Sequence, residues 1–340
     1  MSTSMPIESN KDLPKCLNTP TKQAKKAREL ATLCTGLVTI KANAPQFQGP
    51  FQGFFSRTVI VTLEDGDQVV IQFRREALDL ECFHLARRAL GSVVPEIELL
   101  HDKELDDNAI FTYRMTCMPG KMWLDAMRGP DPPNKLVTAN KSLGRVLSRG
   151  LTQGDTAKVV DDTLRPHLEL LLSSSDAQIR QFDDTTRHLL ANLDALKVLP
   201  LWVTHFDLNE VNMLLDEHCE VSGLIDWELS TPLPFGMAFN RIHTLAGEYS
   251  GGEFYMPPEF EQAERGFWDE VWEGVSEDVR GLVEANLEAV QLAVRLATLL
   301  DAFEQRDGKL ERYNPVVVKA LGKHLTYRIP RLRGADPPYA

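Results

Sequence analysis

The chain has 340 residues, which corresponds to roughly two domains at about 100 to 200 residues each. Hydrophobic residues make up 43% of it and charged residues 25%, values typical of a globular protein, and they exclude disorder of the whole chain. The 37 basic and 49 acidic residues give a net charge of −12. Nucleic acids and anionic membranes are therefore disfavoured as partners, because both are polyanions.

Other features of composition indicate the compartment. The N-terminus lacks the apolar core of a secretory signal, so we expect a cytoplasmic protein. No apolar run approaches the roughly 18 to 20 residues of a membrane helix. The 5 cysteines are widely spaced without a CxxC pair, and the 8 histidines form no HxxxH or HExxH pair. We therefore expect reduced thiols and no histidine-based metal site.

The N-terminal part is predicted to be rich in strands. Residues 1–20 are polar with three prolines and predict a mobile tail. A helix over 21–36 follows. The β-branched runs 58–63 and 68–73 flank a turn sequence and predict a hairpin. Next we expect a helix over 76–90 ending at Gly91, and strands over 96–101 and 109–115.

Helical patterns dominate after Met118-Pro119-Gly120. We expect helices over 135–151, 164–174, 178–195, 259–275, 279–304 and 315–325, the apolar stripe being clearest in 279–304. The fold class is therefore α+β, with a small β-rich N-lobe and a larger α-helical C-lobe. The expected bounds are a tail over 1–20, an N-lobe over 21–118, a C-lobe over 119–330 and a second tail over 331–340.

The segment 201–228 combines strand-like runs with polar side chains at defined spacings. His205, Asp207 and Asn212 precede the run Met213–Leu215, and Asp226 follows the run 221–225. A hairpin would bring Asn212 and Asp226 together, with Asp207 on the loop before them. Phosphoryl transfer needs oxygen ligands for Mg²⁺, which Asn212 and Asp226 can supply. It also needs a carboxylate that accepts the proton of the attacking hydroxyl, a role that suits Asp207.

These residues resemble a known family. The pattern H-F-D-x4-N followed by I-D-W-E is similar to the catalytic and metal-binding loops of the aminoglycoside phosphotransferase and choline kinase group, which has a bilobal protein-kinase-like fold. The likeness covers roughly residues 45–305 and is nearest to divergent fungal-type phosphotransferases. It implies an ATP-dependent kinase acting on a small-molecule hydroxyl, either of a metabolite or of an aminoglycoside-like acceptor. It also implies Asp207 as the catalytic residue, Asn212 and Asp226 as Mg²⁺ ligands, and a loop-bracing His205.

The same resemblance assigns residues of the N-lobe to the nucleotide. Residues 49–56, ending at Ser56, stand where the family has its phosphate loop, although a plain turn before a strand is an equal alternative. Glu81 stands at the position of the glutamate that pairs with the phosphate-binding lysine. The backbone from Thr116 to Met118 stands at the hinge that contacts adenine.

The sequence also departs from the family. Gln72 occupies the lysine position, and residues 42–102 contain no lysine. Arg74 lies on the same strand face as Gln72, so it either replaces the lysine or is a surface arginine at a strand end. Position 206 is Phe where the family usually has Gly. No acidic residue occurs in 229–242, where many members carry a further aspartate.

The sequence is compatible with several alternatives. The missing lysine is compatible with a pseudokinase that binds nucleotide or metabolite without turnover. A protein kinase is disfavoured, because the catalytic loop lacks an HRD-type arginine and no APE-like segment follows Asp226. The acidic residues within 253–278 either hold a cationic acceptor or form a solvated helix face. Trp268 and Trp272, four residues apart, are expected in the core.

Overall fold

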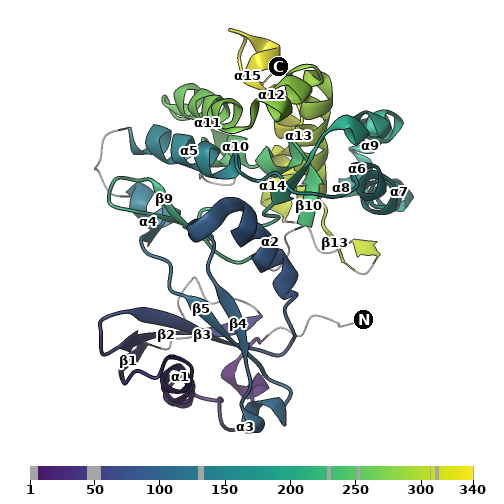
Figure 1. Cartoon of the computed structure of the whole chain (residues 1–340). Coiled ribbons are helices and arrows are strands. Elements are labelled where there is room, and N and C mark those ends of the chain that lie inside the picture. Colours follow the sequence, from purple (N-terminus) through teal and green to yellow (C-terminus); the bar gives the residue numbers. More distant parts are fainter. Residues whose placement is uncertain are drawn as a thin grey trace. The chain divides into compact units, whose positions relative to one another are not determined.

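The structure is a computed structural model that describes residues 7–43, 55–128, 134–227, 231–250, 253–306, 308–310 and 314–339 (Figure 1). The chain divides into two compact units. The N-terminal unit consists of residues 1–87 and 92–119, and the C-terminal unit of residues 88–91 and 120–340. The first contains a five-stranded sheet and the second is mainly helical, which confirms the expected α+β class with a small β-rich and a larger α-helical lobe.

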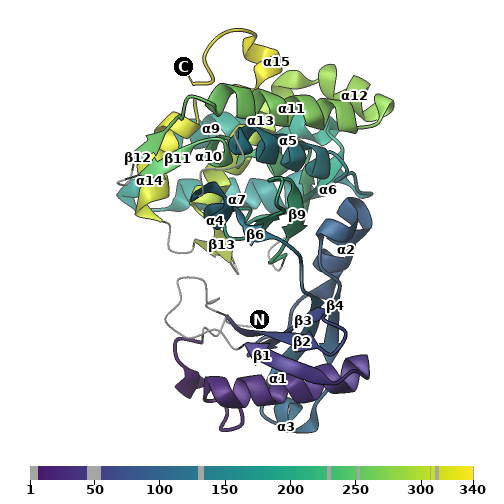
Figure 2. The same ribbon diagram turned by 90° about the vertical axis from the view of Figure 1, so that its left-hand side faces the viewer.

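The N-terminal unit is built on an antiparallel sheet in the order β1-β2-β3-β5-β4. The strands are β1 (Thr39–Asn43), β2 (Ser56–Leu63), β3 (Gln68–Arg74), β4 (Ile97–Leu100) and β5 (Phe111–Thr116). The helices are α1 (Pro20–Thr35), α2 (Leu80–Leu90) and α3 (Lys103–Asp106), with 3₁₀ turns at Asn10–Asp12 and Gly91–Val93. Figure 2 shows α1 running alongside β1 and β2.

The predicted hairpin is confirmed as β2 and β3. The two strands pair in register from Ser56 opposite Arg74 to Thr62 opposite Gln68. Gly66 lies in the connecting turn with φ +92°, a left-handed backbone that favours glycine. The apolar residues of one sheet face are buried in a core shared with α1, namely Val59, Val61, Ile71 and Phe73. Alternate residues, among them Thr58 and Gln72, therefore project from the other face.

The N-terminal segment is ordered by packing, so the prediction of a mobile tail is wrong for residues 7–17. Ile7, Leu13 and Leu17 are at most 5% exposed and belong to the same core as α1 and the sheet. The guanidinium of Arg57 donates a hydrogen bond to the Ile7 carbonyl at 2.6 Å. Three apolar side chains scattered among polar ones give no periodic signal, yet their burial holds the segment in place.

The C-terminal unit is mainly helical. Its longer helices are α5 (Lys135–Leu147), α7 (Arg165–Ser173), α9 (Asp183–Asn192), α11 (Phe260–Gly274), α12 (Glu277–Glu284), α13 (Leu287–Ala302) and α14 (Pro315–His324). Shorter ones are α4 (Trp123–Arg128), α6 (Thr156–Val159), α8 (Ala177–Arg180), α10 (Ile242–Leu245) and α15 (Pro330–Arg333), with a π turn at Val160–Leu164 and 3₁₀ turns at Leu193–Val198 and Met237–Phe239.

Short strands connect these helices. They are β6 (Lys121–Met122), β7 (Leu201–Thr204), β8 (Met213–Leu215), β9 (Val221–Leu224), β10 (Thr231–Pro234), β11 (Glu248–Ser250), β12 (Glu253–Tyr255), β13 (Gln305–Arg306) and β14 (Lys309–Leu310). β6, β8 and β9 form one sheet, and β7 pairs with β10. None of the five cysteines forms a disulfide, and all of them lie within the described residues. Across the described ranges, no helix is both long enough and apolar enough to span a bilayer.

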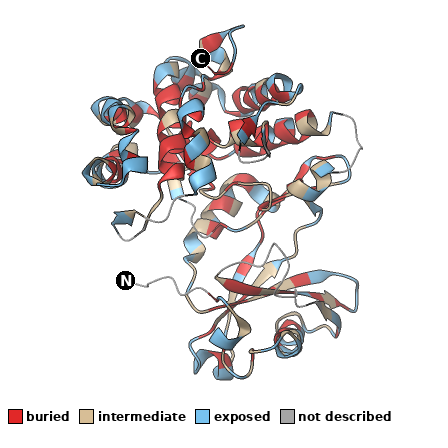
Figure 3. Ribbon diagram, turned by 180° about the vertical axis from the view of Figure 1, so that it is seen from behind, coloured by how far each residue is buried: buried red, intermediate tan, exposed pale blue. Residues whose placement is uncertain are grey.

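The single helix predicted over 279–304 is two helices. α13 is buried along almost its whole length and is the mostly red central helix of Figure 3. α12 ends before it, and the break falls at Asn286. The Asn286 side-chain amide donates to the Leu282 carbonyl at 2.8 Å, so it takes an acceptor that a continuing backbone would use. The predicted helix over 178–195 is likewise divided, into α8 and α9.

The expected C-terminal tail over 331–340 is wrong for residues 331–339. Arg333 donates to both carboxylate oxygens of Glu264 at 2.8 and 2.6 Å, and both side chains are at most 1% exposed. The Tyr327 hydroxyl donates to the same carboxylate at 2.5 Å. A buried carboxylate is costly unless it is paired. Glu264 therefore fixes α15 to α11, through a partner 69 residues away that sequence spacing does not reveal.

Candidate functional site

The polar residues of segment 201–228 are positioned by two strand pairs of the C-terminal unit. β7 is buried and pairs with β10 from Leu201 to Thr204, which fixes the start of the loop at His205. β8 and β9 form the predicted hairpin, with Met213 opposite Leu224. The Ile225 N–H donates to the Asn212 carbonyl at 2.9 Å. Asp226 therefore directly follows the residue bonded to Asn212, which is the juxtaposition that the spacing predicted.

Asp207 is held by two asparagine amides. Asn209 Nδ2 donates to Asp207 Oδ1 at 2.7 Å. Asn212 Nδ2 donates to Asp207 Oδ2 at 3.1 Å and to the Asp207 carbonyl at 2.8 Å. Because the nitrogen of the Asn212 amide is directed at Asp207, its Oδ1 is the oxygen that remains for another ligand.

Asn209 is a site residue that sequence reasoning missed. Its Oδ1 accepts hydrogen bonds from the Val211 N–H at 2.9 Å and the Asn212 N–H at 3.2 Å. This Asx turn orders the loop and aims the side-chain amide back at Asp207. The sequence feature that could have identified it is an asparagine two residues after Asp207, in a stretch whose composition favours a turn.

His205 stabilises the loop through a partly buried hydrogen bond. It is 5% exposed, and its Nε2 lies 2.7 Å from the Ile225 carbonyl. A carbonyl only accepts hydrogen bonds, so Nε2 carries the proton. Burial lowers the pKa of His205 and favours the neutral ring, which lies 4.5 Å from Trp227. The histidine thus ties the end of β7 to the residue before Asp226.

Asp226 has an unusual backbone. Its φ of +67° lies in the left-handed region, which disfavours most residues with a side chain but is tolerated by aspartate. The side chain is exposed. Glu228, the last residue of the I-D-W-E pattern, lies outside the described residues. The left-handed backbone of Asp226 is held by the surrounding structure, and such conformations are common at functional sites, where they orient a side chain.

A second carboxylate responds to the charge of Asp207. Asp301, on α13, accepts a hydrogen bond from Arg241 Nη2 at 2.5 Å, and the two side chains are 11% and 18% exposed. Burial, and to a smaller extent the negative charge of Asp207, raise the pKa of Asp301 to about 6, although Arg241 acts in the opposite direction. Sequence reasoning did not identify this pair, whose members are 60 residues apart.

The raised pKa of Asp301 predicts a pH dependence of stability. The folded state holds this proton more tightly than the unfolded chain, so stability should fall as pH rises from about 4 to about 6. Two pKa units correspond to roughly 2–3 kcal/mol of unfolding free energy. We expect Asp301→Asn to remove that loss in urea unfolding at pH 4.5 and 7. The exposed Asp269→Asn is the control, and an unchanged pH dependence in Asp301→Asn would contradict the assignment.

In the N-terminal unit, three of the predicted nucleotide-binding residues lie together on one sheet face. Ser56 is opposite Arg74, and Thr58 is opposite Gln72. Gln72 Nε2 donates to Ser56 Oγ at 3.1 Å and to Thr58 Oγ1 at 3.3 Å. Arg74 Nη1 donates to Gln72 Oε1 at 3.5 Å. The structure therefore forms a polar cluster around Gln72, the residue that the resemblance aligned with the family's lysine.

Arg74 is not the surface arginine that remained an alternative. It is only 5% exposed. Burial raises the pKa of the Tyr113 hydroxyl, and the hydrogen bond from Leu78 and the positive charge of Arg74 act in the opposite direction. That hydroxyl accepts a hydrogen bond from the Leu78 N–H at 2.8 Å, just before α2.

The remaining predicted residues are spread over the N-terminal unit. Glu81 is exposed in the first turn of α2, and its N–H donates to Asp79 Oδ1 at 3.0 Å. Thr116 ends β5 and exchanges backbone and hydroxyl hydrogen bonds with Glu96 at 3.0 and 3.2 Å. Met118, half-buried, follows two residues later. Residues 49–54 of the expected phosphate loop lie outside the described residues.

The acidic segment 253–278 is largely a solvated face. Most of its carboxylates are exposed, whereas Glu264 is buried in its pair with Arg333. Trp268 and Trp272 are at most 2% exposed and stack at 5.8 Å, which confirms their place in the core.

The fold is supported by a solved structure with a TM-score above 0.5, and two further solved structures are similar at lower scores. A candidate aminoglycoside phosphotransferase from Ralstonia eutropha JMP134 matches with a TM-score of 0.52 and 15% identity, over 81% of this chain and 85% of that one. An ethanolamine kinase from Plasmodium vivax matches with a TM-score of 0.49 and 13% identity, over 86% of this chain and 83% of that one. A macrolide 2'-phosphotransferase from Brachybacterium faecium matches with a TM-score of 0.48 and 14% identity, over 83% of this chain and 92% of that one.

Sequence comparison identifies the family. No curated protein sequence matches the chain. The sequence model of the phosphotransferase enzyme family matches residues 49–254, which is more than half of the chain and includes Asp207, Asn212 and Asp226. The resemblance noted in the sequence is thereby confirmed, and the chain belongs to the phosphotransferase enzyme family.

Proposed function

We propose that this protein is a cytoplasmic kinase that uses ATP and Mg²⁺ and transfers the γ-phosphoryl group to a hydroxyl of a small molecule. The acceptor would be a metabolite or an aminoglycoside-like compound. The observation that carries the proposal is the Asp207 carboxylate fixed by two amides, with an amide oxygen and Asp226 beside it. Membership of the phosphotransferase enzyme family supports the reaction class.

Asp207 is proposed as the residue that acts on the acceptor. Its carboxylate aligns the hydroxyl and accepts its proton as the oxygen attacks phosphorus. Asn209 and Asn212 each hold one carboxylate oxygen, so the group is oriented before substrate arrives. Such preorganisation reduces the entropy lost on reaching a reactive geometry.

Asn212 and Asp226 are proposed as the metal ligands. An amide oxygen and a carboxylate are hard donors, and Mg²⁺ in proteins commonly uses one or two carboxylates with phosphates and water. The orientation of the Asn212 amide fits this role, because its nitrogen is already bonded to Asp207. When bound, Mg²⁺ neutralises charge on the nucleotide phosphates.

The N-terminal unit is proposed to hold the nucleotide. Ser56, Gln72 and Arg74 would contact the phosphates from one sheet face, with Arg74 supplying the charge that lysine supplies elsewhere in the family. Glu81 would orient the guanidinium, and the backbone from Thr116 to Met118 would meet the adenine. A protein that only binds nucleotide is less well supported, because the Asp207–Asn212 arrangement is intact.

Substitution of Asp226 tests the metal site. We expect Asp226→Ala to abolish the tightening of ATP binding by Mg²⁺, because the only carboxylate in the proposed ligand set is lost. ATP titration by calorimetry with and without Mg²⁺ measures this. Asp216→Ala, in the turn at the other end of the same hairpin, is the control and should keep the metal dependence. The same metal dependence in Asp226→Ala would exclude this ligand.

The overall activity is tested by ADP production with Mg²⁺ against a panel of hydroxylated metabolites and aminoglycosides. We expect turnover with at least one acceptor class above the background hydrolysis of ATP. Absence of both ATP binding and turnover across the panel would overturn the proposal and favour a non-catalytic binding protein.

A further inference from the structure

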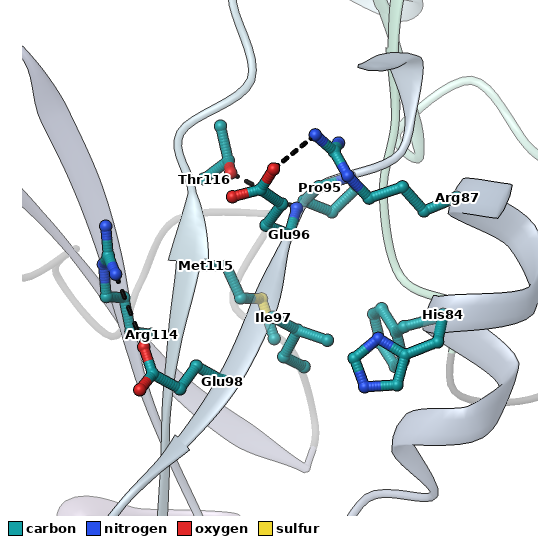
Figure 4. A pocket seen from close by; sticks show the side chains of 10 residues that line it. His84, Arg87, Pro95, Glu96, Ile97, Glu98, Arg114, Met115 and Thr116 are labelled. Atoms are coloured by element: carbon teal, nitrogen blue, oxygen red, sulfur yellow. Dashed lines mark hydrogen bonds and ion pairs between the residues drawn. The ribbon is translucent and has the colours of Figure 1, made fainter. Parts of the chain in front are cut away.

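A cavity of about 240 Å³ lies within the N-terminal unit, between α2 and strands β4 and β5 (Figure 4). Its lining consists of Phe83, His84, Arg87, Pro95, Glu96, Ile97, Glu98, Arg114, Met115 and Thr116. Of the residues proposed to bind nucleotide, only Thr116 contributes to this lining. The cavity therefore adjoins the proposed nucleotide site without being formed by it.

The centre of the cavity is apolar. Ile97 and Met115 are opposite each other in the β4–β5 ladder, and Figure 4 shows them side by side with His84 across the opening. Ile97 is 8% exposed, and Phe83, a residue of α2, is 2% exposed. At roughly 30 Å³ per water molecule, the cavity corresponds to about eight waters. That space suits one aromatic ring or branched alkyl group.

One wall carries a well-positioned guanidinium. Arg87 donates to the buried Val94 carbonyl, and its Nη2 donates to Glu96 Oε1 at 2.6 Å. The carbonyl anchors the side chain, which is 31% exposed. Glu96 is 70% exposed, so its ion pair with Arg87 is screened by water and contributes little. The arginine is therefore fixed, whereas its carboxylate partner is easily displaced.

Two polar side chains of α2 lie on one side of the cavity. His84 is one helical turn before Arg87, on the same face of α2, and its ring adds a further hydrogen-bonding group. Arg114 is bound to Glu98 at 3.4 Å, on the opposite side of Ile97 from His84 in Figure 4. An anionic group entering from α2 would therefore meet Arg87 and His84, with apolar surface below it.

We propose that this cavity binds a small monocarboxylate with an apolar body. The ligand carboxylate replaces Glu96 on the guanidinium of Arg87, in the paired geometry that arginine offers to carboxylates. The apolar part lies against Ile97 and Met115. Such a ligand would contact both α2, which begins near Glu81, and β5, which ends at Thr116.

The test is a fluorine NMR titration of the purified full chain with 4-fluorophenylacetate. We expect saturable binding that Arg87→Gln weakens at least tenfold. Glu96→Gln should instead tighten binding several-fold, because it removes the internal competitor. Arg114→Gln is the matched control, an arginine of the same lining whose removal should change affinity less than twofold.

Binding is measured directly, so the outcome does not depend on the proposed kinase activity. 4-Fluorobenzyl alcohol, which lacks the carboxylate, should bind more weakly than the acid. No saturation by the acid, wild-type affinity in Arg87→Gln, or weaker binding in Glu96→Gln would each overturn the proposal. The Glu96 variant alters an exposed side chain, so it stays informative if the Arg87 variant folds poorly.

Discussion

Asp207→Asn should reduce turnover by about 10² to 10⁴-fold, the usual range for loss of a general base. The substituted side chain has the same size but cannot take the hydroxyl proton. In the wild type, asparagine amides donate to both carboxylate oxygens of Asp207. In the variant one of these oxygens becomes an NH₂ group, so two hydrogen-bond donors face each other. We therefore expect a local loss of about 1 kcal/mol of stability with nucleotide binding retained. Steady-state ADP production, thermal unfolding and ATP titration together separate these effects.

The matched control for this variant is Glu210→Gln. Glu210 lies three residues after Asp207 on the same loop, so its substitution removes the same charge from nearly the same place. It should retain most of the activity. Wild-type turnover in Asp207→Asn, or an equal loss in Glu210→Gln, would remove Asp207 from the proposed mechanism.

Local patterns in the sequence predicted the local parts of the fold. The β2–β3 hairpin depends on two β-branched runs and a glycine turn, all within twenty residues, and it forms as predicted from these runs. The β8–β9 hairpin similarly brings Asn212 beside Asp226. In both cases strand periodicity and a short turn determine which side chains meet.

The parts that were missed depend on contacts between distant segments. Arg333 is buried because it pairs with Glu264. Asp301 has its raised pKa because α13 buries it and brings it near the charge of Asp207. The sequence around Arg333 and around Asp301 does not distinguish either residue from an exposed charged residue. Ile7 is buried for the same reason, since its partners are supplied by the sheet. Asn209 was missed although it is local, because its role depends on side-chain direction in a turn.

Arg74→Ala should reduce turnover by about 10² to 10³-fold, the scale expected for loss of one preorganised charge donor. The guanidinium is nearly buried, lies on the face of Ser56 and Gln72, and is the proposed substitute for the missing lysine. Arg74→Lys should recover only part of the activity, because the two-pronged geometry is lost. The measurements are kcat and KM for ATP.

Two further variants show whether the charge itself matters. Arg57→Met removes a buried arginine of the same hairpin that binds the Ile7 carbonyl, so it should lower stability yet leave KM for ATP unchanged while folded. Gln72→Lys in the Arg74→Ala background restores a cation at the family's lysine position, beside Ser56 and Thr58. We expect this double variant to regain part of the lost ATP affinity. Normal turnover in Arg74→Ala, or no gain from Gln72→Lys, would show that the phosphates are neutralised elsewhere.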